Sequence, residues 1–349
     1  MTTPAQMSDI DVKQPTAPPQ DGAPQWRQSA LANAERFGLI VVFAIVIVVF
    51  SVLRPDTFAT VANWRSIGAS ESVLAVAALA LMPALLCGRF DVSVGGNLAM
   101  SCIATGAMIC RFSVPTVIAI MLGVVVGGLI GLFNGIIVAY FGVNSIIGTL
   151  AVSTILGGVI IAYTQGQPIS DGLPALFTDL GADLIFGIPT MFIIMLAIAA
   201  ATWLLFTQTP FGRTVSALGS NINAARLSGI PVKRVVMLSF MTGGLLAGAA
   251  GVLIIGQLGS ANPNVGSLSD ILPALAAVFL GATTWRPGTY TVLGTLIALF
   301  FVGTTISGLA LLGTQPWVTD VFNGSAVVIA IAVSAQFRRH STGTLAVGE

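Results

Sequence analysis

Long apolar stretches with almost no charge constrain this chain more than any other feature of its sequence. A helix needs about 20 apolar residues to cross the ~30 Å hydrocarbon core of a bilayer. The chain has 349 residues, of which 55% are hydrophobic and 8% are charged, whereas an average soluble domain has about 25% charged residues. The sequence therefore predicts an all-α, polytopic bundle of transmembrane helices. The candidate spans, about ten, cover residues 38–53, 72–88, 92–110, 115–141, 146–164, 188–206, 235–256, 271–284, 289–312 and 318–336.

The eighth run, residues 271–284, is short and contains Pro273. Such a run is either a full span or a half-helix that enters and leaves from the same side. The distribution of basic residues favours keeping it in the count. With ten spans and the N-terminus inside, all basic residues except Arg54, Arg65 and Arg111 lie in the cytoplasm, as the positive-inside rule expects. We therefore predict that both termini are cytoplasmic.

Three regions follow from this pattern. Residues 1–36 are polar and rich in Pro, Gln and Ala, a composition that predicts a disordered cytoplasmic tail. Residues 37–337 form the transmembrane domain, and residues 338–349 form a second cytoplasmic tail. No basic cluster is interleaved with aromatic residues, so nucleic acid is not an expected partner.

Glycines recur at regular spacing in two of the predicted spans. Gly123, Gly127, Gly131 and Gly135 follow one another every four residues, and the seventh span contains another such stripe from Gly244 to Gly251. Stripes of small residues allow helix backbones to approach closely in lipid. The pattern predicts close helix packing, either within one chain or between two chains.

Several residue types are missing from the predicted spans. Asp320 is their only charged residue, whereas carriers driven by ions usually keep buried charged groups. The chain also has no phosphate-binding loop of the G-x-x-x-x-G-K-[ST] type and no nucleophile–base pair of a hydrolase. The three cysteines lack C-x-x-C spacing and are expected to be small core residues. We therefore expect no catalytic residues, no metal site, no cofactor and no enzymatic activity.

The cytoplasmic loop at residues 207–234 is the polar segment that carries most information. Asn221 can cap a short helix from Ile222 to Leu227, and Gly229 followed by Pro231 can end it. This helix is either a simple interfacial helix or a rigid element that transmits motion from a cytoplasmic partner.

The same loop resembles the signature of ribose-type ABC importer permeases. The matching residues are Gly212-Arg213, Gly219-Ser220-Asn221, Ala224-Ala225, Ser228-Gly229-Ile230 and Val232-Lys233. Further matches along the chain are Asp91-Val92-Ser93-Val94-Gly95, Gly131-Leu132-Phe133-Asn134-Gly135 and Gly166-Gln167-Pro168-Ile169. The resemblance covers roughly residues 38–336.

The resemblance implies a multi-pass protein of the bacterial inner membrane that imports a monosaccharide or related polyol. Its partners would be two cytoplasmic ABC ATPase subunits or domains, an extracytoplasmic sugar-binding protein and a second permease copy, in a homodimer or heterodimer within the lipid bilayer. The ATPases would drive the permease through the loop at 207–234. The residues implied in this coupling are Gly212, Arg213, Gly219, Asn221, Ala224, Ala225, Arg226, Gly229 and Ile230.

Polar residues in spans three to five, or directly before span three, are candidates for the translocation pathway of an uncharged solute. They are Asp91, Ser93, Asn97, Asn134 and Thr149. Buried polar side chains in lipid also serve as hydrogen-bonding contacts between helices, so both roles remain open. Two other functions also remain open: an ABC permease for branched-chain amino acids, and an ion-coupled carrier or channel.

Overall fold

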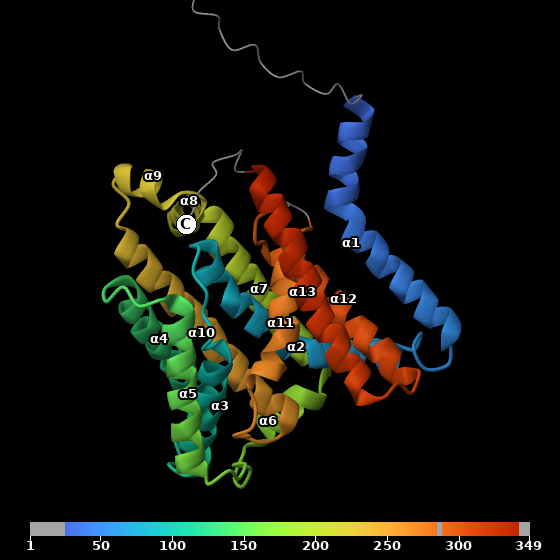
Figure 1. Cartoon of the computed structure of the whole chain (residues 1–349). Helices are drawn as coiled ribbons and strands as arrows, with labels where there is room; N and C mark the ends of the chain where they lie inside the picture. The colour runs from blue at the N-terminus through green and yellow to red at the C-terminus, as the bar shows by residue number, and fades with distance from the viewer. Residues whose placement is uncertain (1–24, 285–287, 342–349) are drawn as a thin grey trace, which may run out of the picture.

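The computed structural model describes residues 25–284 and 288–341 as a bundle of helices (Figure 1). The strands in this described part are β1 (Leu184–Ile185) and β2 (Ile188–Pro189), which pair as a small antiparallel hairpin. No sheet contributes to the core of the described residues. The helical fold class predicted from the sequence is thus confirmed.

Among the described residues, six helices are long and apolar enough to cross a membrane: α2 (Val61–Leu86), α4 (Thr116–Ala139), α5 (Ser145–Thr164), α7 (Thr190–Gln208), α10 (Val232–Leu258) and α12 (Val292–Leu311). Four shorter apolar helices coincide with the remaining predicted spans. They are residues Phe37–Leu53 of α1 (Gln25–Leu53), α3 (Val94–Cys110), α11 (Leu268–Gly281) and Pro316–Ala332 of α13 (Pro316–Ser341). Ten spans with both termini in the cytoplasm remain a prediction.

Two helices are longer than their apolar runs. Helix α1 begins at Gln25, inside the stretch expected to be a disordered tail, and α13 continues to Ser341. Residues 1–24 and 342–349 of the two predicted tails lie outside the described residues.

Helix α2 also begins earlier than expected, which overturns one prediction. Thr60 caps α2 by accepting a hydrogen bond from the Asn63 backbone N–H at 3.2 Å. The cap therefore starts the helix eleven residues before the apolar run, and Glu71 lies inside a candidate span, packed against Gly303 of α12. The expectation that Asp320 is the only charged residue in a span is wrong.

Helices α2 and α10 form the centre of the bundle. In α2, 72% of the apolar window is buried, compared with 28% in each of α4, α5 and α7. Helix α10 packs against α4, α2 and α3. The apolar side chains of α4, α5 and α7 that remain exposed form the outer surface of this chain.

The two glycine stripes contact each other within the chain. A methyl group on Gly127 would lie 2.6 Å from the Gly248 Cα atom, and one on Gly131 would lie 2.8 Å from the Gly244 Cα atom. Helices α4 and α10 therefore touch backbone to backbone. This finding decides between the two uses left open by the sequence, because these stripes join two helices of one chain.

The helices form two groups, α2–α5 at residues 61–164 and α10–α13 at residues 232–341. In each group a long central helix is followed by a short one, and the two groups run through the bundle in opposite directions. Helix α2 runs from the β1–β2 hairpin, where Arg65 bonds Gly187, to the level of α8 (Pro210–Ser220), where Leu86 meets Gly219. Helix α10 runs the other way, from α9 (Ile222–Leu227) to α6 (Ala175–Ala182). We call these two ends the α8 end and the α6 end (Figure 1). In each group the short second helix, α3 or α11, packs on the central helix of the other group.

Both short helices begin part-way along the bundle, after a non-helical segment. Residues 259–267 run back along α3, so that Ala261 lies over Gly106 and Gly266 lies against Gly95. Gly95 and Gly106 are eleven residues apart in α3, which corresponds to about 16 Å along a helix axis. Helix α11 has 14 residues, or about 21 Å, which is less than the hydrocarbon core. The structure thus favours the half-helix alternative for this segment.

Candidate functional site

The predicted coupling loop forms two short helices, α8 and α9, that project from one end of the bundle (Figure 1). The helix predicted at Ile222–Leu227 is confirmed as α9. Helix α8 was missed by the sequence analysis. Its signal is present, because Thr209 caps it and Pro210 occupies its first turn, the two residue types that favour a helix start.

Helix α9 is closed at both ends by hydrogen bonds. The Asn221 side chain accepts hydrogen bonds from the Asn223 and Ala224 N–H groups, each at 3.0 Å. At the other end Gly229 has a φ of 80°, and the Ile230 N–H donates to the Ala225 carbonyl at 3.1 Å. This is a Schellman motif, which requires a left-handed residue at the Gly229 position. The two caps make a six-residue helix rigid.

Helix α8 attaches the pair to the bundle. Val215 and Leu218 are fully buried. A side chain at Gly212 would collide with the backbone of Phe206 in α7, and one at Gly219 would collide with the Leu86 carbonyl at the end of α2. A force applied to α8 is therefore transmitted directly to α2 and α7.

The opposite surface of the pair is exposed in the part of the chain that the structure describes. Leu227 is 90% exposed although it is apolar. The other predicted coupling residues divide between the two faces: Arg213, Asn221, Ala224, Arg226 and Gly229 are exposed, Ala225 is buried and Ile230 is half-buried.

The predicted pathway residues lie together in one buried network near the start of α3. Ser93 donates to the Asp91 carboxylate at 2.6 Å and accepts a hydrogen bond from the Asn134 side chain at 2.6 Å. Thr149 accepts a hydrogen bond from the Val92 N–H at 2.9 Å. The network ties residues 87–93 to α4 and α5. Asn97 adds a separate contact by donating to the Gly127 carbonyl at 3.0 Å.

We expect Asn134→Ala to destabilise the permease, because an interhelical hydrogen bond in lipid contributes about 1–2 kcal/mol. Thermal unfolding in detergent should show a melting temperature lower by several degrees. Asn223→Ala, on the exposed surface of α9, is the matched control and should change the melting temperature little. Unchanged stability together with lost transport would instead indicate that Asn134 faces the pathway.

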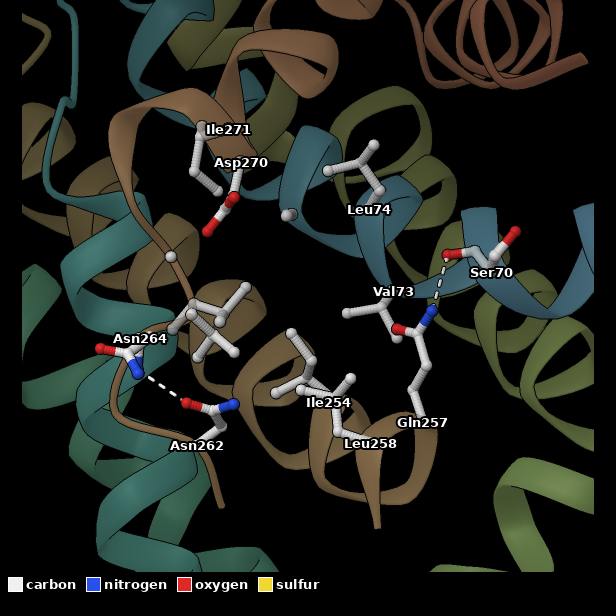
Figure 2. Close-up of a pocket in the computed structure, with 14 residues that line it drawn as sticks. Ser70, Val73, Leu74, Ile254, Gln257, Leu258, Asn262, Asn264, Asp270 and Ile271 are labelled. Carbon is white, nitrogen blue, oxygen red and sulfur yellow. Dashed lines mark hydrogen bonds between the residues drawn. The ribbon is translucent and has the colours of Figure 1, made fainter. Parts of the chain in front are cut away.

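A pocket of about 330 Å³ opens between α2, α3, α10 and the segment at residues 259–267. Figure 2 shows polar groups on two sides, with the Gln257 side chain, bonded to the Ser70 carbonyl, across from Asn262 and Asn264 and separated from them by apolar side chains that include Ile254 and Leu258. None of the predicted pathway residues lines this pocket. The sequence analysis missed it because its polar residues lie on three separate elements.

The part of the chain that the structure describes contains no evident metal site. No group of three or more His, Cys, Asp or Glu side chains there could hold an ion.

Comparison with known proteins identifies the family. A family model described as "Branched-chain amino acid transport system / permease component" matches residues 66–332. The chain belongs to this permease family. The match begins in α2 and ends in α13, so it includes both groups of helices and the α8–α9 pair. Permeases of this family are inner-membrane proteins, and the predicted location of the chain in the bacterial inner membrane is confirmed.

Several permeases of known name are similar over most of their length. The ribose import permease protein of Haemophilus influenzae is 34% identical, over 83% of this chain and 90% of the relative. That of Bacillus subtilis strain 168 is also 34% identical, over 85% and 92%. The D-allose transport system permease protein of Escherichia coli K12 is 31% identical, over 86% and 91%. These relatives confirm the resemblance to ribose-type permeases. No solved structure matches the chain.

Proposed function

We propose that this permease is the membrane-spanning subunit of an ATP-driven, binding-protein-dependent importer for a monosaccharide or related polyol. The observation that carries the proposal is the similarity, over most of both chains, to permeases named for ribose and D-allose import. The family description mentions branched-chain amino acids, but these relatives favour a sugar.

The α8 end is the cytoplasmic side in this proposal. Arg89, Arg213, Arg226, Lys233 and Arg234 lie in or beside the segments at this end, and cytoplasmic loops collect such residues. The surface of α9 that includes Leu227 would contact an ATPase, and α8 would transmit its motion to α2 and α7. ATP hydrolysis would thus take place on a separate chain, and this subunit would not itself be an enzyme.

The remaining partners follow from the same proposal. Two ATPase subunits would pair with two permease copies, as a homodimer or a heterodimer. A sugar-binding protein would deliver the solute to the α6 end, where Asp171, Asp179 and Asp183 lie.

Uptake of radiolabelled D-ribose and D-allose tests the function. The permease is expressed with its ATPase and binding protein in cells that lack their own uptake of the two sugars. We expect uptake to disappear when the ATP-binding lysine of the ATPase is replaced. Uptake that continues without ATP hydrolysis would indicate an ion-coupled carrier, for which Glu71 would be the first residue to examine, and would refute the proposal.

Saturable uptake of L-leucine, with neither sugar competing, would support the amino-acid alternative. Either result is read from transport alone, so it is independent of the α9 interface discussed below.

A further inference from the structure

The pocket beside residues 259–267 has a polar rim and an apolar base. Ser70, Gln257 and Asn264 are exposed at its rim, whereas Val73, Ala77 and Leu98 are buried at its base. The rim lies toward the α6 end, because Gln257 is in the last turns of α10. The base lies deeper, at the level where α11 begins. The pocket therefore leads from the α6 surface into the bundle.

The backbone beside the pocket is unusual for its depth. Residues 259–267 are not helical although they run about 16 Å along α3. At membrane depth, irregular backbone occurs where it is buried in protein or lines a water-filled cavity, and interrupted helices commonly form solute sites in transporters. The polar backbone of this segment is thus placed where a hydrated solute could use it.

The side chains at the rim suit hydroxyl groups. Gln257, Asn262 and Asn264 each carry an amide that can donate and accept hydrogen bonds. The hydrogen bonds that these amides already make leave free capacity. Gln257 donates to the Ser70 backbone carbonyl at a long 3.4 Å, and the side-chain oxygen of Asn262 accepts from the Asn264 backbone N–H. Leu74 and Ile254 offer apolar surface for the C–H groups of the same ligand.

The charges around the pocket argue against anionic and zwitterionic ligands. Asp270 is the one charged residue in its lining, and no Lys, Arg or His lines it. The first turn of α11 could bind a carboxylate, but the Asp270 carboxylate already lies there. Ser267 and Asp270 form a capping box, with Asp270 accepting from the Ser267 N–H at 3.0 Å. A carboxylate or phosphate would meet the negative charge of Asp270 without a compensating cation.

We propose that this pocket is a binding site for an uncharged polyol of monosaccharide size, located within a single permease chain. Its volume of about 330 Å³ falls within the range of small-molecule sites, about 300–1,000 Å³. The proposal rests on the proposed function, since the α6 end must receive the imported solute. It adds a place where the solute binds after leaving the binding protein, and the lack of a basic residue in the lining would favour a sugar over an amino acid.

Protection of a cysteine at the rim tests the site without ATPase or binding protein. Ser70→Cys is introduced into the full-length chain carrying Cys110→Ser; Cys87 and Cys102 are buried. The purified permease is labelled with a membrane-impermeant maleimide. The probes are D-ribose, D-allose and any other sugar that the uptake assay identifies, each at 10–100 mM as the approximate range for weak sites of millimolar affinity. Transported sugar should slow labelling at least fivefold, and L-leucine and ribose 5-phosphate should not.

Two matched serine variants locate the effect. Ser170→Cys is exposed at the same end of the bundle but lies outside the pocket. Ser66→Cys, one helical turn away on α2, lines the neighbouring hollow that contains Arg65 and that Ser70 and Gln257 also border, so it reports a ligand bound there instead. Neither should be protected. Equal protection of all three cysteines, protection of Ser70→Cys by L-leucine, or no protection by the transported sugar would each overturn the proposal.

The result is separable from the proposed function. If sugar uptake depends on the ATPase but Ser70→Cys is not protected, only the proposal that the pocket binds the sugar is refuted. If a monosaccharide protects Ser70→Cys but the chain shows no ATP-dependent uptake, the pocket is supported as a sugar site and the proposed importer function is refuted.

Discussion

Replacing Leu227 with aspartate should release the ATPase from the permease while leaving the bundle folded. Leu227 is 90% exposed on α9. Burying a leucine in an interface contributes about 1.5–3 kcal/mol, and an aspartate would bring an uncompensated charge to the same place. A loss of about 3 kcal/mol corresponds to roughly 100-fold weaker association. Co-purification of the ATPase with tagged permease should therefore disappear, and so should sugar uptake.

The other end of the molecule provides the control. Phe186 is fully exposed at the tip of the β1–β2 hairpin, so Phe186→Asp makes a similar change on the opposite side. This variant should retain the ATPase. If Leu227→Asp elutes as a folded permease with the ATPase still bound, α9 is not the coupling helix.

The largest effect on folding is expected for Gly244→Leu. Gly244 lies against the backbone of Gly131. A methyl group added to Gly244 would lie 2.8 Å from the Gly131 Cα atom. Overpacked side chains usually cost about 1–3 kcal/mol because neighbouring side chains can move. Here the neighbour is a helix backbone, so α4 and α10 would have to separate. We expect no monodisperse permease in fluorescence-detected size-exclusion chromatography.

Gly157→Leu is the matched control, since Gly157 is also in an apolar helix but has nothing within 4 Å of the added Cβ position. It should yield normal amounts of folded protein. Normal folding of Gly244→Leu would mean that the α4–α10 contact described above does not hold in the membrane.

The short helix α9 shows how far local sequence can predict structure. Asn221 and Gly229 define its two ends through hydrogen bonds between residues at most five positions apart. Such contacts are encoded within a few residues, and the prediction was confirmed. The start of helix α8 depends on equally local contacts, since Thr209 caps it and Pro210 occupies its first turn. The sequence therefore contains the signal for α8 as well, although α8 is not among the predicted helices.

The start of α2 shows where apolar runs mislead. The run began at Ser72, but Thr60 starts the helix. A hydropathy pattern reports which residues tolerate lipid, whereas a cap decides where hydrogen bonding begins. Glu71 falls between these two points, and its place against Gly303 depends on α12, more than 200 residues away.

The roles of the polar residues needed the assembled bundle. Asp91, Ser93 and Asn134 were selected as isolated polar residues, and the structure joins them in one network between α3, α4 and the preceding segment. Their part in a pathway remains a prediction. The pocket residues Ser70, Gln257 and Asn264 gave no local signal, because each lies on a different element.

The sequence by itself determined that this chain is a membrane-embedded helical bundle, and it located the loop through which an ATPase would act. Composition, hydropathy and caps are properties of single segments, so they can be read without knowing neighbours. The tertiary structure alone decided that the two glycine stripes meet, that α11 is a short helix of 14 residues, and that a polar pocket opens beside it. Each of these depends on which backbones approach across long sequence separations, and only the packing of α2, α3, α4 and α10 brings those segments together.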